Sequence, residues 1–441
     1  TFCLIQEKKF VVIEKIKQTI EIDGFSWHYA WIIVLISSII QTLASSIRMT
    51  FGVLITPLSE SFNWSQGDIT IAYAISNIVT ALTAPLAGSL GDRYGEKKMM
   101  IIGSFFFIFG LIFTGYSKDL TTLYISYGFI IGIGHSLLLV PLIPVIMKWF
   151  KKHLALGISV WMTSWGIGPA LSSPIIAALL NQFGWKNTFW IIGIIFTVSI
   201  IYLLRYFYDS PESKGILPYG ISNNSKTSQN DEPTWKNIRE IQKLIRNTQE
   251  YWNMCSIHFL GCVGHSIILI YIVPIALFQN ISLIKASIIL SLMSGTSIIS
   301  RFLTPLICEK FGIRTFMSIS FLLQSIPIFL LFGTSNIWIF YFFAIIFGIG
   351  YGGEAGGFPI LNRRYYGNAP MGGPTGIQFL GGGLGMALGG WIGGMLFDFY
   401  GNYDLSLLLS ICASATGMFS ILLLQNPNKT LFPQQSKLTE K

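Results

Sequence analysis

Long apolar runs separated by short polar segments are the dominant pattern along this chain. The first six runs lie near residues 29–58, 68–90, 98–117, 120–148, 153–181 and 186–208. Six more lie near residues 251–279, 283–307, 315–333, 337–363, 371–398 and 403–424. Each run holds roughly the 20 residues that a helix needs to cross about 30 Å of hydrocarbon. The pattern therefore predicts an all-α polytopic membrane protein with twelve transmembrane helices, six plus six.

A polar stretch between the two sets of runs divides the chain into halves. Its second part, TWKNIREIQKLIRNTQEYW, has the apolar spacing of an amphipathic helix that lies along a membrane surface. We therefore expect five segments, namely a cytoplasmic N-terminal segment (1–28), an N-terminal six-helix bundle (29–208), a cytoplasmic linker with an amphipathic helix (209–250), a C-terminal six-helix bundle (251–424) and a cytoplasmic tail (425–441).

The basic residues indicate how these helices are oriented. With both termini placed inside, the 29 Lys and Arg residues fall in the N-terminal segment, the inner loops, the linker and the tail, except for Lys118, Lys186, Lys285, Arg48 and Arg301. The three lysines lie in outer loops, and the two arginines lie within spans. Because positive residues in short loops mark the cytoplasmic side, we expect a multi-pass protein of the cell (inner) membrane with both termini in the cytoplasm.

The two halves also repeat in sequence. GDRYG at 91–95 matches CEKFG at 308–312, and Pro57 matches Pro274, both at an offset of 217 residues. GIG at 132–134 recurs at 348–350, an offset of 216 residues. Matches at nearly one spacing indicate a duplicated six-helix unit, hence two pseudo-symmetric bundles. Parallel repeats of this kind place a substrate site between the halves, near the middle of the bilayer.

Composition agrees with this class and excludes others. The chain is 52% hydrophobic and 11% charged, with a mean hydropathy of +0.60. Its net charge of +9 does not indicate a nucleic-acid partner, because the charges lie in short loops and not on one face of a soluble domain. The five cysteines have no metal-ligand spacing, and the glycine-rich stretch 381–385 continues an apolar span without a preceding strand. We expect no nucleic acid, no metal site and no cofactor.

A charged motif at the inner end of the second span resembles a known family signature. Gly88, Leu90, Asp92 and Arg93 occur in the order G-x-L-x-D-R, followed by Tyr94-Gly95-Glu96-Lys97-Lys98. A weaker copy of this stretch occurs at Glu309-Lys310-Phe311-Gly312. Together the two copies resemble the loop signature of the major facilitator superfamily, and the resemblance to that family extends over all twelve spans. This resemblance implies the major facilitator fold, and gating roles for Gly88, Asp92, Arg93, Glu309 and Lys310. A charged turn that follows the positive-inside rule is the alternative.

A second, narrower resemblance concerns the entry to the fifth span. The stretch 148–159, KWFKKHLALGIS, is similar to the corresponding part of monocarboxylate porters and oxalate/formate-type exchangers. The stretch 23–27 is a degraded form of the acidic-Gly-aromatic stretch of the same group, which carries a substrate-binding Arg where this chain has Arg301. The family's usual Asp four residues earlier is Ser297 here, so the resemblance does not imply an Asp/Arg proton relay in the eighth span.

Polar side chains inside the spans are the candidates for chemistry. In this architecture spans 1, 4, 7 and 10 line the cavity, and they carry Gln41, Arg48, His135, His258, His265, Tyr351 and Glu354. The repeat offset pairs Arg48 with His265, Gln41 with His258, and His135 with Tyr351. We therefore expect these groups to face one another across the pseudo-axis. On span 5, Trp161 and Trp165 suit either a cavity wall or a packed core.

The residue types suggest a division of roles. Arg48 offers a planar fork that binds a carboxylate through two hydrogen bonds, although it could instead be a structural partner of a helix end or of Glu354. Arg301 either binds the same carboxylate or forms an ion pair with Glu354. Glu354 is the only acid within a span and is the candidate for a coupling proton, as is His265. Substrate contacts are expected from Arg48, Arg301, His265, Gln41, His135 and Tyr351.

These expectations combine into one functional hypothesis and its alternatives. The sequence predicts a secondary active transporter of small organic anions of the monocarboxylate type, which works by alternating access with proton coupling, as a monomeric unit in the lipid bilayer. An anion exchanger of the oxalate/formate type, with a counter-anion in place of the proton, and an exporter of amphipathic compounds are the alternatives. An enzyme is not expected, because the chain shows no HExxH motif and no nucleophile elbow.

Overall fold

The computed structural model describes residues 19–22, 25–221, 235–367, 369 and 371–425. The N-terminal half contains α2 (Tyr29–Met49), α3 (Phe51–Phe62), α4 (Gln66–Tyr94), α5 (Glu96–Thr114), α6 (Leu120–Leu123), the π-helical η1 (Tyr124–Ile130), α7 (Ile131–Leu139), α8 (Leu142–Trp149) and α9 (Leu154–Arg205). The short helix α10 (Pro211–Lys214) and α11 (Trp235–Arg246) follow. The C-terminal half contains α12 (Gln249–Phe278), α13 (Leu283–Phe311), α14 (Ile313–Ser325), the 3-10 helix η2 (Ile326–Leu331), α15 (Ile337–Tyr366), α16 (Gly372–Tyr400) and α17 (Asp404–Leu423).

Eleven helices in the described part of the chain are long and apolar enough to cross a membrane. The sequence predicts twelve spans, and the difference lies in α9, whose 52 residues hold the fifth and sixth spans. The two are separated only at Gly184, where φ is 71° and ψ is 171°, a conformation that glycine adopts without the steric cost of a Cβ. The predicted helical membrane fold is confirmed.

A small β-hairpin precedes the first span and adds to the predicted all-α fold. Strand β1 (Thr19–Ile22) pairs antiparallel with β2 (Phe25–His28), with Ile22 opposite Phe25. The connecting residues Asp23 and Gly24 lie outside the described residues. Asp-Gly is the dipeptide that favours a two-residue hairpin turn, so the sequence carried a signal for this hairpin that the span pattern does not show.

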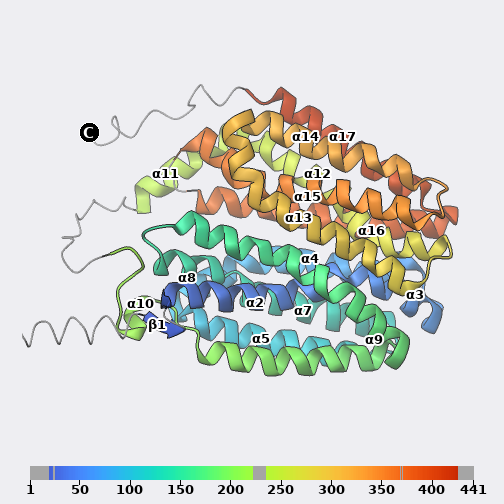
Figure 1. The fold of residues 1–441 in the computed structure, drawn as a ribbon, viewed down its shortest axis with the longest axis horizontal. Coiled ribbons are helices and arrows are strands. Elements are labelled where there is room, and N and C mark those ends of the chain that lie inside the picture. Colours follow the sequence, from blue (N-terminus) through green and yellow to red (C-terminus); the bar gives the residue numbers. More distant parts are fainter. Residues whose placement is uncertain (1–18, 23–24, 222–234, 368, 370, 426–441) are drawn as a thin grey trace, which may run out of the picture.

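The helices form two bundles that lie side by side (Figure 1). The N-terminal half is blue to green in this view, and α12 to α17 of the C-terminal half are yellow to red. Between the halves α4 packs against α16, α9 against α13, and α3 against α12. We call the end of the molecule with α10 and α11 the linker face, and the opposite end, where α3 leads into α4, the far face.

Two glycines show how closely the halves approach each other. A Cβ at Gly52 would overlap the carbonyl oxygen of Ile270, where α3 crosses α12. A Cβ at Gly166 would lie 2.7 Å from Cγ1 of Ile298, where α9 crosses α13. Small residues at such crossings let helix backbones pack closely in a membrane, where burial of apolar surface contributes little to helix association.

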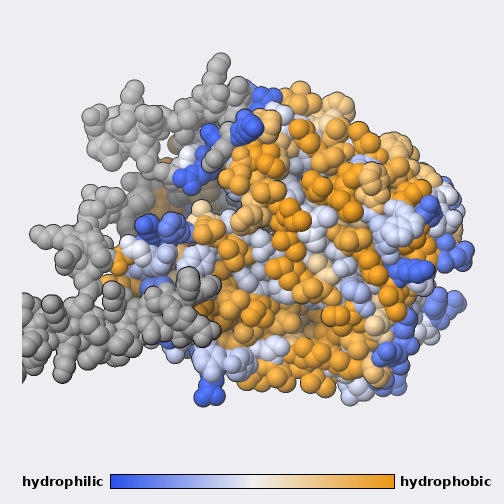
Figure 2. Space-filling view, in the orientation of Figure 1, coloured by the Kyte–Doolittle hydropathy of each residue, from blue (hydrophilic) through white to orange (hydrophobic). Residues whose placement is uncertain are grey.

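The outer surface is that of a protein that lies in lipid. Large apolar side chains are exposed on both halves, for example Phe105, Val198, Ile201, Trp338 and Leu423. Figure 2 shows them as a broad apolar belt, with hydrophilic residues gathered at the far face and near the linker face. A solvated surface of this kind would be an aggregation liability, so the belt marks the part of the molecule that faces the hydrocarbon.

The first part of the linker packs on the N-terminal half. The indole Nε1 of Trp149 donates to the carbonyl oxygen of Tyr208 at 3.0 Å, and the amide of Tyr219 donates to the carbonyl oxygen of Trp149 at 2.9 Å. The Lys214 ammonium lies over the ring of Tyr29, 3.3 Å from its centroid, and burial lowers the pKa of Lys214. Residues 209–221 therefore cover the linker face of this half.

Candidate functional site

Arg48 lies in the last turn of α2, next to the break between α2 and α3 at Thr50. Its guanidinium donates to Oδ1 of Asn77 on α4 and approaches Sδ of Met386 on α16 at 3.5 Å. Its Cζ also lies 6.0 Å from the centre of the Trp165 ring on α9. These neighbours are all neutral and come from both halves.

The ion pairs formed by the described residues join Lys148 to Glu96 and His265 to Glu354, and Arg48 takes part in neither. The structure therefore does not place Glu354 beside Arg48, which was one alternative for this arginine. A guanidinium that is half-buried among neutral groups near the middle of a span has unused capacity for an anion.

Glu354 lies on α15 and is 1% exposed. Its Oε2 is 3.2 Å from Nδ1 of His265 on α12 and accepts a hydrogen bond of 2.9 Å from Nε2 of Gln324 on α14. Gln324 was not among the residues singled out from the sequence, because α14 belongs to the ninth span, which the architecture does not place at the cavity. The acid is thus held inside the C-terminal half by two neighbouring helices.

Arg301 on α13 is 9% exposed and lies over the ring of Tyr351, with Cζ 4.9 Å from the ring centre. The imidazole of His265 lies against the same ring, at a centroid distance of 4.9 Å. Tyr351 therefore contacts both Arg301 and His265. Of the two alternatives for Arg301, the described contacts do not include an ion pair with Glu354.

The remaining predicted cavity residues lie in different surroundings. Gln41 is fully buried, and neither atom of its amide has a hydrogen-bond partner in the described chain. His135 likewise lacks such a partner, and its ring lies 6.3 Å from Phe107 and 6.4 Å from Trp165. His258 packs against Phe358 at 4.3 Å. The structure thus brings His135 near Arg48 through Trp165, whereas His258 lies in an aromatic contact within the C-terminal half.

The predicted gating motif lies at the linker face. Asp92 and Arg93 are exposed, and Arg93 lies over the ring of Tyr94 at 5.2 Å. The nearest atom to a Cβ at Gly88 would be Cγ1 of Val140, at 3.9 Å. In the second copy Lys310 is exposed and lies 5.5 Å from the ring of Phe311, and the side chain of Glu309 is outside the described set.

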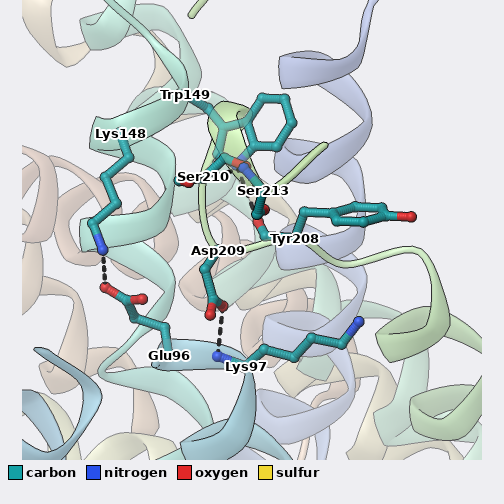
Figure 3. A network of polar contacts seen from close by, with 8 residues as sticks. All are labelled: Glu96, Lys97, Lys148, Trp149, Tyr208, Asp209, Ser210 and Ser213. Carbon is teal, nitrogen blue, oxygen red and sulfur yellow. Dashed lines mark hydrogen bonds and ion pairs between the residues drawn. The ribbon is translucent and has the colours of Figure 1, made fainter. Parts of the chain in front are cut away.

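The residues that follow the motif make the buried polar contacts at this face. Glu96 forms an ion pair with Lys148 of α8, and the backbone amide of Lys97 donates to Oδ1 of Asp209 at 2.6 Å (Figure 3). Asp209 thereby caps the start of α5, and burial raises the pKa of its carboxyl. Sequence reasoning missed Asp209, which is 112 residues from Lys97.

The duplicated motif has the same backbone geometry in both halves. Gly95 has φ 97° and ψ 137°, and Gly312 has φ 80° and ψ 147°. Gly95 lies between α4 and α5, and Gly312 lies between α13 and α14. A side chain at either position would be strained, so the repeated glycine of the motif has a structural reason.

The far face holds a contact between the halves that the sequence did not indicate. The carboxylate of Asp398, at the end of α16, accepts hydrogen bonds from the backbone amides of Gln66 at 3.0 Å and Gly67 at 2.7 Å, at the start of α4. The hydroxyl of Tyr403 donates to Oε1 of Gln66 at 2.7 Å. We call these four residues the far-face latch. An anion at a helix N-terminus is stabilised by the free amides and the helix dipole.

A second contact joins the halves where α9 meets α13. The hydroxyl of Ser173 donates to the carbonyl oxygen of Ser287 at 2.9 Å, and that of Ser291 donates to the carbonyl oxygen of Ala170. Both pairs lie near the start of α13, toward the far face. In the described part of the chain, the hydrogen bonds between the halves lie at the level of Arg48 or between it and the far face. The halves are therefore joined on the far face.

Comparison with known proteins identifies the family. The family model described as "Major Facilitator Superfamily" matches residues 34–309 and 254–440. The chain is 24% identical to the uncharacterized MFS-type transporter YcxA of Bacillus subtilis (strain 168) over 401 residues, which cover 89% of this chain and 94% of that protein. It is 20% identical to monocarboxylate transporter 12 of Xenopus laevis over 428 residues, covering 91% and 92%.

Other similarities are shorter or concern the fold alone. Monocarboxylate transporter 7 of Homo sapiens is 25% identical over 248 residues, 55% of this chain, and the match spans about half of that protein, 46% of its length. The solved structure of a D-xylose-proton symporter has a TM-score of 0.74 at 16% identity, covering 91% of this chain and all of that one. A solved structure of the nucleoside transporter NupG has a TM-score of 0.71 at 14% identity, covering 89% and 100%.

The family model covers more than half of the chain, and the fold, the duplicated loop glycines and the apolar belt agree with it. The resemblance that the sequence motifs indicate is thus confirmed at the level of the family. The chain belongs to the major facilitator superfamily, a family of membrane transporters and not of enzymes.

Proposed function

We propose that this protein is a proton-coupled secondary transporter of small organic anions of the monocarboxylate type, which works by alternating access. The observation that supports this proposal best is the environment of Arg48. Its guanidinium lies between the two halves, contacts Asn77 of one half and Met386 of the other, and takes part in no ion pair among the described residues. A substrate carboxylate would supply the missing charge and would be recognised through two hydrogen bonds.

Proton coupling answers an energetic requirement of anion uptake. An anion that enters a cell works against a negative-inside potential, at a cost of about 2.3 kcal/mol per elementary charge per 100 mV. A cotransported proton cancels that charge movement. Glu354 is the acid within a span, and His265 beside it can share the proton that this acid takes up, so that the protonated pair is neutral overall. A counter-anion would serve the same purpose in an exchanger.

The contacts between the halves suggest which state the structure represents. The far-face latch and the α9–α13 contacts close one side, and the positive loops lie on the other. With the termini in the cytoplasm of a cell (inner) membrane, the far face is the outer side. We infer that this is the state of the cycle in which the outer side is closed, and that opening the latch is part of the return step.

The names of relatives support the substrate class. Several curated relatives are named monocarboxylate transporters, among them numbers 7 and 12, and the fold neighbours include a proton symporter. At 20 to 25% identity, these names agree with a carboxylate as the proposed ligand of this chain. The transport unit in this proposal is the single chain, since both halves contribute to the Arg48 surroundings.

Uptake into proteoliposomes tests the proposal. Purified protein is reconstituted, and labelled carboxylates of one to six carbons are offered with and without an inward proton gradient, while an external electrode records pH. We expect uptake of at least one carboxylate, driven by the gradient and accompanied by alkalinisation outside. Uptake without alkalinisation would reject symport, and a dependence on carboxylate loaded inside would favour exchange.

The arginine must be tested in the same vesicles. We expect R48A to remove uptake, whereas R205A, which changes an exposed arginine at the linker-face end of α9, should leave it close to that of the unmodified protein. If R48A transports carboxylates normally, the anion site lies elsewhere, and an exporter of amphipathic compounds becomes the better hypothesis.

A further inference from the structure

The surroundings of Glu354 contain a residue that the proposed function does not use. Gln324 of α14 is fully buried, and its Nε2 donates to Oε2 of Glu354 at 2.9 Å and approaches the carbonyl oxygen of Ser320, one helical turn earlier, at 3.4 Å. The backbone carbonyl thus helps to orient the amide toward the acid. Burying a polar side chain in a lipid-embedded bundle is costly unless it is hydrogen-bonded, and the Gln324 amide nitrogen meets this condition through Glu354 and Ser320.

The two oxygens of the Glu354 carboxyl have different hydrogen-bond surroundings. Both neighbours, Gln324 and His265, contact Oε2, whereas Oε1 is buried without a hydrogen-bond partner in the described chain. Oε1 points at Gly261 of α12, where an added Cβ would overlap it, and Phe321 of α14 lies beside the same position. A carboxylate charge is shared by both oxygens, so this pocket supports that charge on one side only.

We propose that Gln324 is a positioning residue that holds the Glu354 carboxyl against His265, and that these three side chains form one site for an exchangeable proton inside the C-terminal half. This inference rests on the proposed proton coupling and names the residues that tune it. With the proton bound, the pair is neutral overall, as carboxylate and imidazolium or as carboxylic acid and imidazole. When the proton leaves, a neutral imidazole and a carboxylate remain, and Gln324 continues to donate to that carboxylate.

The groups that face Glu354 from the surrounding helices are known from the structure. On α12 they are His265, and at longer range His258 and Cys262. On α15 and α13 they are Tyr351 and Arg301, and the ring of Tyr351 contacts both that cation and His265. Helices α14 and η2 present no ionisable side chain here, only the Gln324 amide. Gln324 is therefore the neutral donor in the group, and its removal changes no charge.

The direction of its effect follows from hydrogen-bond chemistry. A donor to a carboxylate favours the charged form of the acid, so losing that donor makes the proton harder to remove. Replacing Gln324 by Met keeps most of the volume and removes the donor. We expect the titration midpoint of the Glu354–His265 pair to rise by about one pH unit, a tenfold gain in proton affinity.

Infrared titration of the purified, substrate-free protein measures this directly. The carboxyl and imidazole bands are followed with pH, and the bands lost in E354Q and H265N identify the pair. We expect Q324M and Q324N both to raise the midpoint, and the pH optimum of gradient-driven uptake to move in the same direction. Two variants with intact size-exclusion profiles guard against a result that reflects misfolding.

A second pair of variants tests the pocket around Oε1. G261A places a methyl group where Oε1 lies, and should displace the carboxyl and change the midpoint. G264A is the matched control, because a Cβ there, one turn along α12, would meet Ser414 and not Glu354. We expect G264A to leave the midpoint unchanged.

The outcomes separate this inference from the proposed function. If neither Q324M nor Q324N moves the midpoint, or if no band assigned to the pair titrates, Gln324 is a packing residue and the proposal is wrong. If the midpoint moves as expected but no carboxylate is transported, the proton site stands and the substrate class fails. If carboxylates are transported with alkalinisation while the pair does not titrate, the coupling site lies elsewhere and this inference fails alone.

Discussion

The offset of 217 residues between the repeats pairs Arg48 with His265, and the surroundings of these two residues differ. Arg48 in the N-terminal half is half-buried and contacts neutral groups, Asn77 and Met386. His265 in the C-terminal half is 6% exposed and is paired with Glu354. Among the described residues, no acid pairs with Arg48 in one repeat, whereas in the other repeat Glu354 lies beside His265.

This difference suggests how a duplicated unit divides its tasks. A permanent cation without a fixed partner suits a mobile anion, whereas a buried acid and imidazole suit a proton. Arg301 stands apart from both, because it lies over Tyr351 and not against Glu354.

Removing the unpaired charge should have the largest effect. A bidentate contact between guanidinium and carboxylate is worth about 3 kcal/mol, so R48A should lower uptake about 100-fold. R48K keeps the charge but loses the planar fork, and should recover only part of the activity. Initial rates in proteoliposomes measure both. Equal rates for R48A and the unmodified protein would show that the N-terminal charge has a structural role only.

Opening the far-face latch tests whether the contact between Asp398 and the start of α4 keeps the two halves together at the far face. Asp398 accepts two hydrogen bonds from the start of α4, and D398A removes both. A loss of about 2 kcal/mol would shift the balance between states roughly 30-fold toward far-face opening. Spin labels at E60C and D404C, two exposed far-face positions on opposite halves, report this as a longer distance in double electron–electron resonance.

The control for the latch is D68N. Asp68 lies one residue after Gly67 in α4 and is an exposed acid, while the hydrogen bonds of the latch belong to Asp398. A longer distance in both variants would mean that any acid near this face stabilises the closed form, and that the cap on α4 has no special role.

Neutralising the C-terminal acid should separate coupling from binding. In E354Q the carboxyl can no longer take up a proton, whereas Arg48 is unchanged. We expect gradient-driven uptake to fall about tenfold and to lose its pH dependence, while exchange of labelled for unlabelled substrate at equal pH continues. If equilibrium exchange falls with it, Glu354 supports the substrate site and the two halves do not divide the tasks.

The smallest effect is expected from Asp209, an acid of the linker that caps a helix of the N-terminal half. D209A removes the cap on α5 and should lower the free energy of unfolding by about 1 kcal/mol. D209N keeps an oxygen that can accept from Lys97 and loses the buried charge, so it should be close to neutral. Thermal unfolding in detergent compares the two.

We also expect Asp209 to make the stability of the protein depend on pH. Burial raises the pKa of its carboxyl from the usual 3.8, so the folded protein binds this proton more tightly than the unfolded chain does. The contribution of Asp209 to the free energy of unfolding therefore falls as the pH rises from 3.8 through the higher pKa that this carboxyl has in the folded protein. D209N should lack this part of the pH dependence, and an identical slope in both proteins would show that another group is responsible.

The membrane class, the spans and the repeated loop motif followed from the sequence. The reason is that span length and the match between halves are properties of the chain itself. A helix in hydrocarbon forms its backbone hydrogen bonds within itself. A run of about 20 apolar residues therefore predicts a transmembrane helix whatever its neighbours are. The repeated loop glycines, Gly95 and Gly312, kept their positive φ in both halves for the same local reason.

The partners of the charged groups were decided by the tertiary structure alone. Gln324 and Glu354 are 30 residues apart, Lys97 and Asp209 112, and Gln66 and Asp398 332. No periodicity links such positions, because each contact depends on how helices from separate spans cross. The sequence could therefore show that Glu354 needed a partner, and only the packing of α12, α14 and α15 could show that Gln324 and His265 supply it.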